Sequence, residues 1–519
     1  MHARNELARR SVVSGVEQVR FGARSLQSID RVTALTLAAL AGLTLLRVAG
    51  LLLSQMELDV EEAQYWTWST APAFGYFSKP PLIAWIMGAA ERVCGSGEAC
   101  LRAPAPLLWF ATTAVLFALT RRLYGATTAV WAALLFALAP GIAFSARLIT
   151  TDVPLLLCWA VALYALVRLR ETQAWSWALL LGAALGVGLL AKYAMIYFVV
   201  CALLYAALDP VARRALLSWR GLAACAVAAL VVAPNLAWNA LNQFQTFAHV
   251  QDNVAGRGFG TGLSDLLAFV GGQVGIIGPI LFVVLVARLL GFGRTDRPAA
   301  DRLLLVFSAA ILVPLLLYAI ATPAKANWTA VAYVAGIPLA TASLVHARRD
   351  GWLKLALALG LITQVTLLVG DALASRIRLP FYPGREPYAR VLGWAELARG
   401  AEARARQAGA SAVVTITRSD AALFSYYLRK SGLPVMIWPG GPQPDNYFEW
   451  TRPLRPELGP LVVVSPWPMR DVLQQAFGEI TDLGLITAAT GRTTSRTMLA
   501  YRLAAPRDPV RPWTEYLRR

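Results

Sequence analysis

Apolar runs that are each long enough to cross a lipid bilayer recur along the first 370 residues of the chain. A transmembrane helix needs about 20 mostly apolar residues, and short polar stretches separate about eleven such runs here. We expect helices at roughly 33–53, 105–120, 127–145, 153–168, 175–191, 194–208, 219–235, 266–287, 303–320, 329–345 and 354–370. The pattern predicts a polytopic α-helical membrane domain over residues 33–370.

The residues before the first run are arginine-rich and polar. No small-residue cleavage site follows a short apolar core, so they do not read as a cleavable signal. We interpret residues 1–32 as a basic cytoplasmic arm, in which 5–25 form either an amphipathic segment or a solvated tail.

Basic residues in the loops orient the helices. With the N-terminus inside, every second loop is rich in arginine, which is the positive-inside pattern. The predicted cytoplasmic loops contain Arg121, Arg122, Arg168, Arg170, Arg213, Arg214, Arg220, Arg288, Arg294, Arg297, Arg302, Arg348, Arg349 and Lys354. The loops on the other side contain few basic residues, so the first long loop (55–104) and the tail (371–519) are predicted to face outward.

The tail has a different pattern from the rest of the chain. Short apolar runs at Ala412–Thr417, Pro434–Trp438 and Leu461–Ser465 predict buried strands. Helical stretches are expected at 387–408, 419–431 and 469–477. Strands that alternate with helices predict a small extracytoplasmic α/β domain over 371–519. Its role as a lid, an acceptor platform or a structural cap stays open.

Composition narrows the class of protein. Of the 519 residues, 57% are hydrophobic and 15% charged, against about 45–50% and about 25% in soluble domains. Disorder is excluded, because disordered chains are poor in apolar residues. The net charge of +18 is explained by the arginine-rich loops that are predicted to face the cytoplasm. The charge therefore does not indicate a nucleic-acid partner.

The first outward loop contains many residues that could take part in catalysis or binding. Acidic residues follow the first helix at once, in Glu57-Leu-Asp-Val-Glu-Glu62, and aromatic residues come next. Such rings prefer the membrane interface. We therefore expect this loop to lie on the membrane surface as short amphipathic helices. Its interface aromatic residues include Tyr65, Trp66 and Tyr76, and rigid prolines hold Lys79.

This loop resembles the first extracytoplasmic loop of the GT-C glycosyltransferases. The likeness is greatest to the bacterial branch related to protein O-mannosyltransferases, the aminoarabinose transferase of lipid A and rhizobial galacturonosyltransferases. Its features are the acidic pair, an Ala-x-Tyr-Trp run and the Gly-Tyr-x-x-Lys-Pro-Pro run around Lys79. Further motifs follow in order to about residue 345: Ile149–Leu155, Leu190–Tyr193, Pro234–Asn239 with His249, and Lys325–Trp328.

The resemblance implies an integral membrane glycosyltransferase that acts at the outer face of a bacterial inner membrane. Its donor would be a sugar on a polyprenyl phosphate, and its acceptor a hydroxyl of an envelope glycolipid such as lipid A or lipopolysaccharide. A hydroxyl is a weak nucleophile, so a carboxylate must accept its proton. Negative charge on the departing lipid phosphate must be met by fixed cations.

Matching the motifs assigns roles to individual residues. Glu61 stands where the family usually has its catalytic Asp, Glu62 follows it, and Asp152 matches the acidic residue of the second outward loop. Asp59 is the alternative base. The phosphate-binding candidates are Lys79, Lys325, Arg257 and Lys192, and the further motif residues are Asn327, Trp328 and His249.

Each assignment has a structural alternative. Asp152 can be the N-cap of a helix, and Lys79 and Lys325 can extend their amines to lipid headgroups. His249 can be a hydrogen-bonded structural histidine. Arg47 lies inside the first predicted span, where an ionisable residue suggests function by default, although it is near enough to the end to snorkel.

Metals and cysteines add two expectations. With three histidines and no close carboxylate–histidine cluster, a tightly held transition metal is not expected, whereas a divalent ion bridging carboxylate and phosphate stays open. Cys94 and Cys100 lie in the outward loop, where a periplasm would be oxidising, so we expect a disulfide between them.

Two other functions compete with the one implied by the resemblance. One is a protein O-mannosyltransferase-like enzyme, which would use the same fold on a protein acceptor. The other is a transporter or flippase of lipid-linked sugars, which would more often show inverted repeats and polar residues at mid-membrane. In this chain the ionisable motif residues gather on one predicted face, which favours chemistry there.

Overall fold

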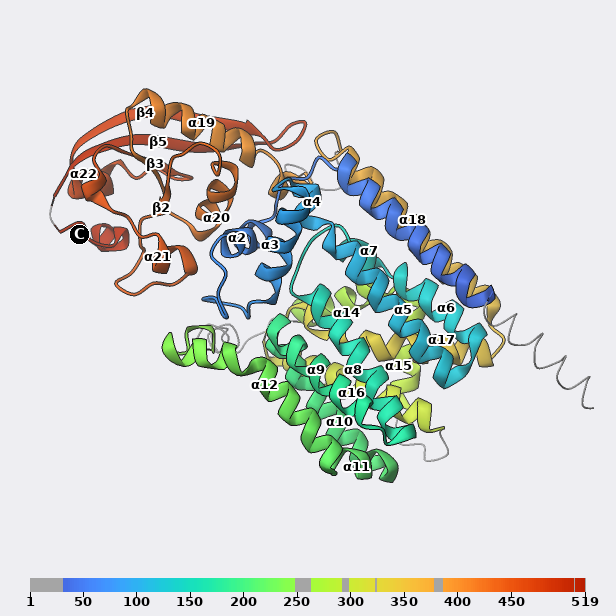
Figure 1. The fold of residues 1–519 in the computed structure, drawn as a ribbon. Coiled ribbons are helices and arrows are strands. Elements are labelled where there is room, and N and C mark those ends of the chain that lie inside the picture. Colours follow the sequence, from blue (N-terminus) through green and yellow to red (C-terminus); the bar gives the residue numbers. More distant parts are fainter. Residues whose placement is uncertain are drawn as a thin grey trace, which may run out of the picture.

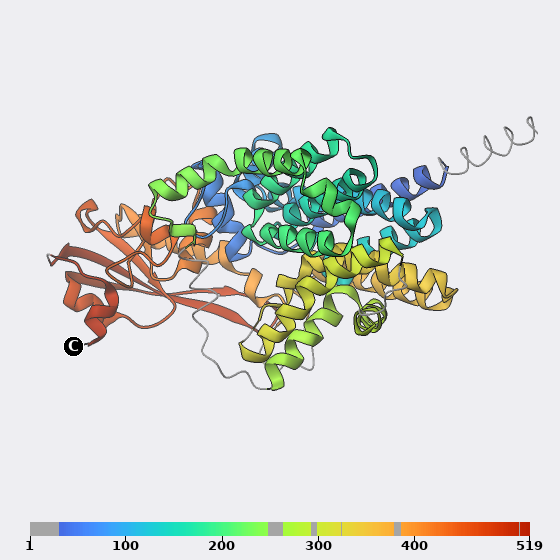
Figure 2. The same ribbon diagram turned by 90° about the horizontal axis from the view of Figure 1, so that it is seen from below.

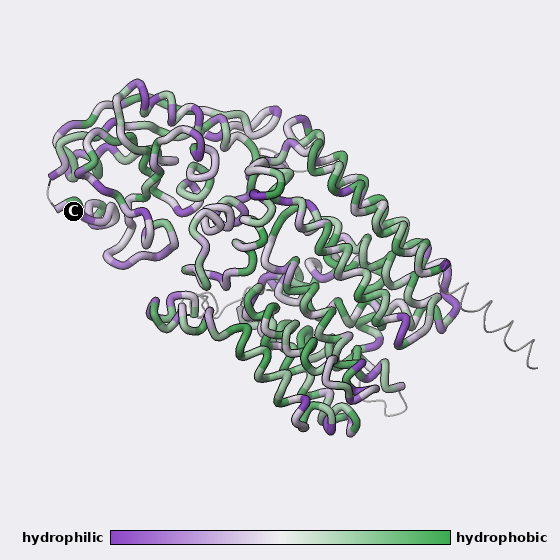
Figure 3. Tube along the Cα trace, viewed as in Figure 1, coloured by the Kyte–Doolittle hydropathy of each residue, from purple (hydrophilic) through white to green (hydrophobic). Residues whose placement is uncertain are grey.

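The computed structural model describes residues 31–247, 263–291, 298–322, 324–377, 386–507 and 509–518. The helices of the membrane domain form one large bundle, and a domain built on a β-sheet lies at one end of it (Figures 1 and 2). Helices α2, α3 and α4 of the first long loop lie between the two. Figure 3 shows the same division, because apolar residues dominate the bundle and polar residues are frequent in the sheet domain.

Helices over the expected spans confirm the polytopic α-helical class. Among the described residues, seven helices are long and apolar enough to cross a membrane, a bent pair adds an eighth span, and three apolar helices are shorter. The membrane-domain helices are the first described helix (Arg31–Leu53), α5 (Pro104–Tyr124), α6 (Ala126–Ala137), α7 (Pro140–Ser145), α8 (Asp152–Thr172), α9 (Trp175–Ala191), α10 (Ile196–Leu208), α11 (Pro210–Leu216), α12 (Trp219–Leu241), α14 (Leu263–Ile277), α15 (Pro279–Leu290), α16 (Ala299–Ala321), α17 (Tyr333–His346) and α18 (Asp350–Ala372).

Two expected spans are not continuous. The run 266–287 breaks between α14 and α15 with a bend of 113°, because Gly278 has φ of +82° and Pro279 has no N–H to continue the helix. The run 127–145 is likewise divided into α6 and α7, and Pro140 begins the second helix. Hydropathy alone predicts one continuous helix for each run, because both runs are apolar on either side of the break.

Arg47 is a structural residue of the helix bundle. Its side chain is buried inside the first helix, where it donates to Oε1 of Gln364 on α18 (2.9 Å) and to the carbonyl oxygen of Ala137 (2.6 Å). These bonds join the first helix to α18 and α6, and the snorkelling alternative does not apply.

The first long loop forms short helices, as we expected. Helices α2 (Val60–Ser69), α3 (Leu82–Cys94) and α4 (Glu98–Arg102) form a layer between the bundle and the sheet domain (Figure 1). Every residue of α2 except Glu61 is buried, because α3 and the sheet domain pack against this helix. Most aromatic residues of this loop are therefore buried, namely Tyr65, Trp66, Trp68, Tyr76 and Phe77, whereas Phe74 is exposed.

The tail forms a five-stranded mixed sheet with helices. The strand order is β2-β1-β3-β5-β4, in which β1, β2 and β3 are parallel, β5 pairs antiparallel with β3, and β4 with β5. Its elements are α19 (Trp394–Gln407), β1 (Ala412–Thr415), α20 (Arg418–Tyr427), β2 (Val435–Ile437), α21 (Tyr447–Thr451), β3 (Leu461–Ser465), α22 (Arg470–Ala476), β4 (Phe477–Ala489) and β5 (Ser495–Pro506).

The three parallel strands and the helices agree with the α/β expectation, whereas the β4–β5 hairpin was missed. These are the two longest strands of the sheet. Most of β4 is exposed, so it lacks the continuous apolar run that identifies β1 and β3. The sequence pattern therefore shows the buried parallel strands and not the exposed strand β4.

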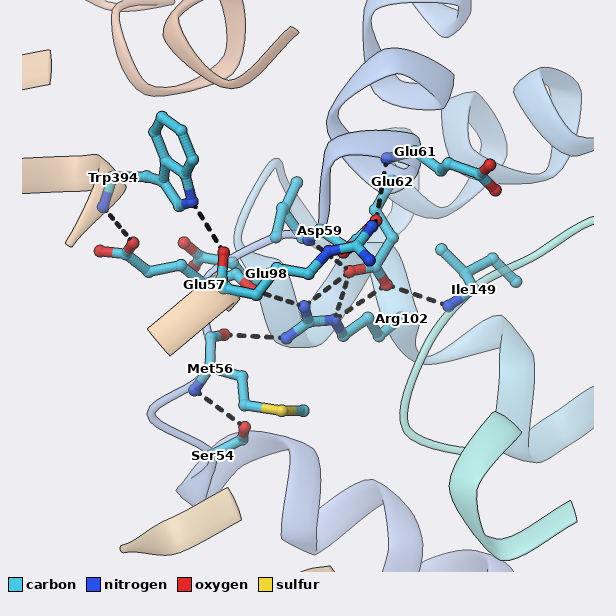
Figure 4. Close-up of polar contacts among 12 residues, drawn as sticks. Ser54, Met56, Glu57, Asp59, Glu61, Glu62, Glu98, Arg102, Ile149 and Trp394 are labelled. Atoms are coloured by element: carbon cyan, nitrogen blue, oxygen red, sulfur yellow. Dashed lines mark hydrogen bonds and ion pairs between the residues drawn. The ribbon is translucent and has the colours of Figure 1, made fainter. Parts of the chain in front are cut away.

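Glu57 connects the loop to the sheet domain. Its carboxylate oxygens accept from the backbone N–H groups of Trp394 (2.5 Å) and Ala395 (3.1 Å), so it caps the start of α19 (Figure 4). Burial raises the pKa of Glu57, and these backbone hydrogen bonds oppose the rise. A carboxylate of the membrane domain thus fixes the first helix of the tail.

A short disulfide loop makes a second connection. Cys94 and Cys100 form a disulfide with Cα atoms 5.8 Å apart, as we expected from the sequence. Between them, the carbonyl oxygen of Ser96 accepts from the hydroxyl of Tyr426 (2.6 Å) and from Nη2 of Arg429 (3.1 Å). The sheet domain therefore docks on a loop that the disulfide closes.

Candidate active site

A cavity of about 470 Å³ lies where the bundle, the first loop and the sheet domain meet. Each of these three parts contributes to its wall. The lining residues are Glu61, Gln64, Tyr65, Phe77, Ser78, Lys79, Pro80, Asp152, Leu155, Lys192, Tyr193, Ala194, Ile196, Tyr197, Lys325, Asn327, Trp328, Val331, Arg418, Asp445, Asn446 and Tyr447. The structure thus brings together most of the site residues expected from the sequence.

Helix α2 places Glu61 in this cavity. The helix begins with a capping box, in which Asp59 accepts from the N–H of Glu61 (3.2 Å) and Glu62 accepts from the N–H of Asp59 (3.0 Å). Glu61 is the exposed residue of the helix, and Oε2 of its carboxylate accepts from the hydroxyl of Tyr65 one turn later (2.9 Å). The carboxylate of Glu61 is therefore held at one oxygen.

Glu62 lies in a different environment from its neighbour. It is 1% exposed, and its oxygens accept from the guanidinium of Arg102 at 2.7–3.2 Å and from the backbone N–H of Ile149 at 3.0 Å. Figure 4 shows the carboxylate of Glu61 directed away from this cluster. Glu62 does not line the cavity, so we revise its expected catalytic role to one of positioning α2.

Asp59 is also engaged elsewhere. In addition to capping α2, its Oδ2 forms an ion pair with Nε of Arg390 (2.9 Å). Asp59 does not line the cavity. The geometry therefore favours Glu61 over Asp59 as the carboxylate that meets a substrate.

Asp152 is the second carboxylate in the cavity. It is the first residue of α8, and its side chain does not cap that helix, because Thr151 holds the N-cap position. Its Oδ1 pairs with Nζ of Lys192 (2.6 Å), and its Oδ2 accepts from Nδ2 of Asn327 (2.9 Å). Two separate chain segments thus orient one carboxylate, and Lys192 is neutralised by it.

Two lysines face the cavity without an anionic partner. Lys79 and Lys325 form no ion pair within the described part of the chain. Burial lowers the pKa of Lys79, whereas the nearby carboxylates of Glu61 and Asp152 act in the opposite direction. A buried cation that has no ion-pair partner in the protein is suited to bind an anionic ligand.

The expected aromatic residues divide between cavity and core. Tyr65 and Trp328 line the cavity, but Trp66 and Tyr76 do not. Trp66 donates from Nε1 to Glu91 (3.1 Å) and packs edge-on against Tyr426 of the sheet domain. Tyr76 stacks on a neighbouring tryptophan of the loop. Trp66 and Tyr76 therefore hold the loop and the domain together.

Four lining residues come from the sheet domain and were not expected. Arg418 begins α20, and the other three are Asp445, Asn446 and Tyr447. No motif marks them, because their position depends on how the domain docks. Two expected residues, Arg257 and His249, lie outside the described residues.

No group of three or more His, Cys, Asp or Glu side chains suited to hold a metal occurs in the part of the chain that the structure describes.

The architecture is shared with a solved membrane enzyme. The crystal structure of ArnT from Cupriavidus metallidurans bound to undecaprenyl phosphate matches with a TM-score of 0.63 at 15% identity, over 89% of this chain and 97% of that chain. The apo structure of the same protein gives a TM-score of 0.62 over 90% of this chain and 97% of that one. The fold is that of a GT-C membrane glycosyltransferase.

Sequence relatives give the family. Residues 78–238 match the family described as dolichyl-phosphate-mannose-protein mannosyltransferase. Lipid A galacturonosyltransferase RgtD of Rhizobium johnstonii is 33% identical over 79% of this chain and 85% of its own length. Lipopolysaccharide core galacturonosyltransferase RgtB of the same organism is 27% identical over 56% of this chain and 61% of its own. The chain belongs to the GT-C glycosyltransferase family that includes RgtD, and it is a glycosyltransferase.

Proposed function

We propose that this enzyme transfers a uronosyl group from a polyprenyl phosphate to a hydroxyl of lipid A or a lipopolysaccharide-like glycolipid. The reaction takes place at the outer face of a bacterial inner membrane, with the N-terminus in the cytoplasm and the C-terminal domain in the periplasm. The observation that carries this proposal is the convergence of Glu61, Asp152 and unpaired lysines in one cavity at the junction of the two domains. The names of the relatives support the sugar and the acceptor.

Glu61 is the base in this proposal. The acceptor oxygen attacks the anomeric carbon of the donor, its proton passes to the free oxygen of Glu61, and the bond from the anomeric carbon to the phosphate oxygen breaks. The hydrogen bond from Tyr65 fixes the other carboxylate oxygen. Glu61 therefore has one oxygen held and one available to the substrate.

Lys79 and Lys325 bind the departing lipid phosphate. The electron pair of the broken bond stays on this phosphate, and fixed cations in a partly desolvated site stabilise that charge as it develops. Lys192 lies close by, but its pairing with Asp152 gives it a different task. The pair orients Asp152 toward a hydroxyl of one of the two sugars.

An apolar part of the wall accommodates the start of the lipid chain. Leu155, Ile196 and Val331 line the cavity from the membrane domain, and the exposed apolar residues of α10 continue from Ile196 toward the bilayer region. A polyprenyl chain is apolar, so it is stabilised against these surfaces and not in water.

A protein O-mannosyltransferase-like activity is the second candidate, and the family match over residues 78–238 favours it. The two activities differ in acceptor and in donor sugar. The transporter alternative has no such support, because the relatives carry the names of transferases.

The test replaces Glu61 by Gln and measures transfer by purified protein in detergent, with a polyprenyl-phosphate galacturonate donor and lipid A as acceptor. We expect the E61Q rate to fall by about a hundredfold or more, since a general base contributes about 10²–10⁴. Envelope glycolipids from cells with and without the gene should differ by one uronic acid mass.

The matched control is Asp59→Asn, which changes the alternative base and keeps a good N-cap residue. We expect D59N to retain most of the activity. Full activity of E61Q together with loss in D59N would transfer the base role to Asp59. Transfer of mannose to a protein acceptor, with none to lipid A, would replace the proposed function by the second candidate.

A further inference from the structure

Arg418 is a cation of the cavity that the proposed reaction does not use. It comes from α20 of the sheet domain, whereas the lysines that face the cavity come from the membrane domain and its loops. Among the described residues Arg418 forms no ion pair. Its Nη1 donates to Oε1 of Gln64 at 2.5 Å. A guanidinium that is oriented by an amide and has no anion has donors left for a ligand.

The partner of Arg418 places it near Glu61 in the cavity. Gln64 follows Glu61 by three positions on α2, so the two side chains are neighbours on the helix surface. The cavity thus has cations from two parts of the molecule, the lysines of the membrane domain and its loops and Arg418 of the sheet domain.

A uronosyl donor also has two anionic groups. Its phosphate is attached to the anomeric carbon, and its carboxylate is attached to the ring carbon on the other side of the ring oxygen. When Lys79 and Lys325 hold the phosphate and Glu61 faces the acceptor at the anomeric carbon, the carboxylate lies within one sugar ring of Glu61. The planar guanidinium is suited to bind a carboxylate with two parallel hydrogen bonds.

We infer that Arg418 binds the carboxylate of the uronosyl group during transfer and so makes the enzyme selective for a uronic acid over the corresponding neutral sugar. This inference rests on the proposed function, which supplies the uronosyl donor. Asn446 also lines the cavity from the sheet domain, and its side chain caps α21. In this inference, the C-terminal domain both covers the cavity and contributes to selectivity for the donor sugar.

The experiment compares two donors that differ in one group, polyprenyl-phosphate galacturonate and polyprenyl-phosphate galactose. For Arg418→Gln we expect KM for the galacturonate donor to rise by about tenfold or more, which is the loss of one charged hydrogen bond. The galactose donor should change little, so the preference between donors falls by a similar factor. Arg418→Lys should restore part of the preference, because it keeps the charge without the planar fork.

Two arginines of the same domain serve as controls. Arg470 begins α22 as Arg418 begins α20, and it does not line the cavity, so Arg470→Gln should leave the preference unchanged. Arg429 holds the domain to the disulfide loop. Arg429→Gln therefore reports the effect of weaker docking, which should lower transfer from both donors equally.

The outcomes separate the alternatives. Equal loss with both donors in Arg418→Gln, as for the docking control, would overturn carboxylate recognition, and so would an unchanged preference. An effect that appears only with phosphorylated lipid A and vanishes with dephosphorylated lipid A would assign Arg418 to the acceptor instead. If the wild-type enzyme transfers no galacturonate at all, the proposed donor is wrong, and this role of Arg418 is wrong with it.

Discussion

Two neighbouring glutamates show how strongly position on a helix decides the use of a side chain. Glu61 lines the cavity and Glu62 is buried against Arg102, although the two are adjacent and chemically identical. A helix turns by about a third of a circle between neighbours, so adjacent residues face different surroundings. The motif assigned both glutamates to the site, and the structure shows that only Glu61 lines the cavity.

Lys79 gives a prediction on pH. Burial lowers its pKa, and in the proposed function only its charged form binds the lipid phosphate. Activity should therefore be present below this pKa and fall as pH rises through it, at a lower pH than for an ordinary lysine. We expect kcat/KM, which reports groups of the free enzyme, to fall on the alkaline side in the wild type. In Lys79→Arg this fall should move to higher pH, because a guanidinium stays charged.

The control for this profile is Arg470→Lys, a charge-conserving change away from the cavity, which should titrate like the wild type. If the Lys79→Arg profile superimposes on that of the wild type after scaling, the alkaline fall belongs to another group.

At the scale of elements, the position of α2 depends on one buried ion pair. Glu62 of α2 and Arg102 of α4 are both nearly inaccessible to solvent, and Arg102 also donates to the carbonyl oxygens of Met56 and Glu57 (Figure 4). The pair thus holds the start of α2, the preceding segment and the end of α4 in one arrangement. The Glu61 carboxylate depends on that arrangement for its place.

Removing one member of this pair should be costly. Arg102→Met leaves the Glu62 carboxylate buried without its cation, and we expect the free energy of unfolding to fall by about 3–5 kcal/mol. Thermal unfolding in detergent measures this effect. The double variant with Glu62→Gln should recover part of the loss, since the unpaired charge is then gone.

The exposed pair of Arg122 and Glu171 provides the comparison. Arg122→Met should change stability by less than about 1 kcal/mol, because water screens a surface pair. Equal effects of Arg102→Met and Arg122→Met would contradict a special role for the buried pair.

Sequence patterns predicted the elements that have a continuous apolar run and failed where the surroundings of an element decide its structure. The membrane helices and the parallel strands β1 and β3 have continuous apolar runs, so their existence was readable. The break at Gly278 depends on two residues inside an apolar run, and strand β4 of the missed hairpin is largely exposed. Arg418 has no motif of its own, because its place in the cavity exists only once α20 has docked on α2.

At the scale of the whole molecule, the disulfide should stabilise the junction of the two domains. Replacing Cys94 and Cys100 by Ser removes a constraint on a short loop, which is worth about 2 kcal/mol, and it loosens the segment that carries Ser96. We expect a lower unfolding temperature and faster proteolytic release of the C-terminal domain. The wild type treated with a reductant should behave like the variant.

Cys225 is the control, because it is a free cysteine of α12 far from the junction in sequence. Cys225→Ser should unfold and be cleaved like the wild type, with or without reductant. Unchanged release of the domain from the double variant would show that docking does not depend on the disulfide.

The contact between Gln64 and Arg418 joins residues that are 354 positions apart. A ribosome that has completed the whole helical bundle has therefore still to synthesise part of the catalytic pocket. Nascent or prematurely terminated chains would occupy the membrane without a closed active site. Such chains would not consume the lipid-linked sugar in that membrane.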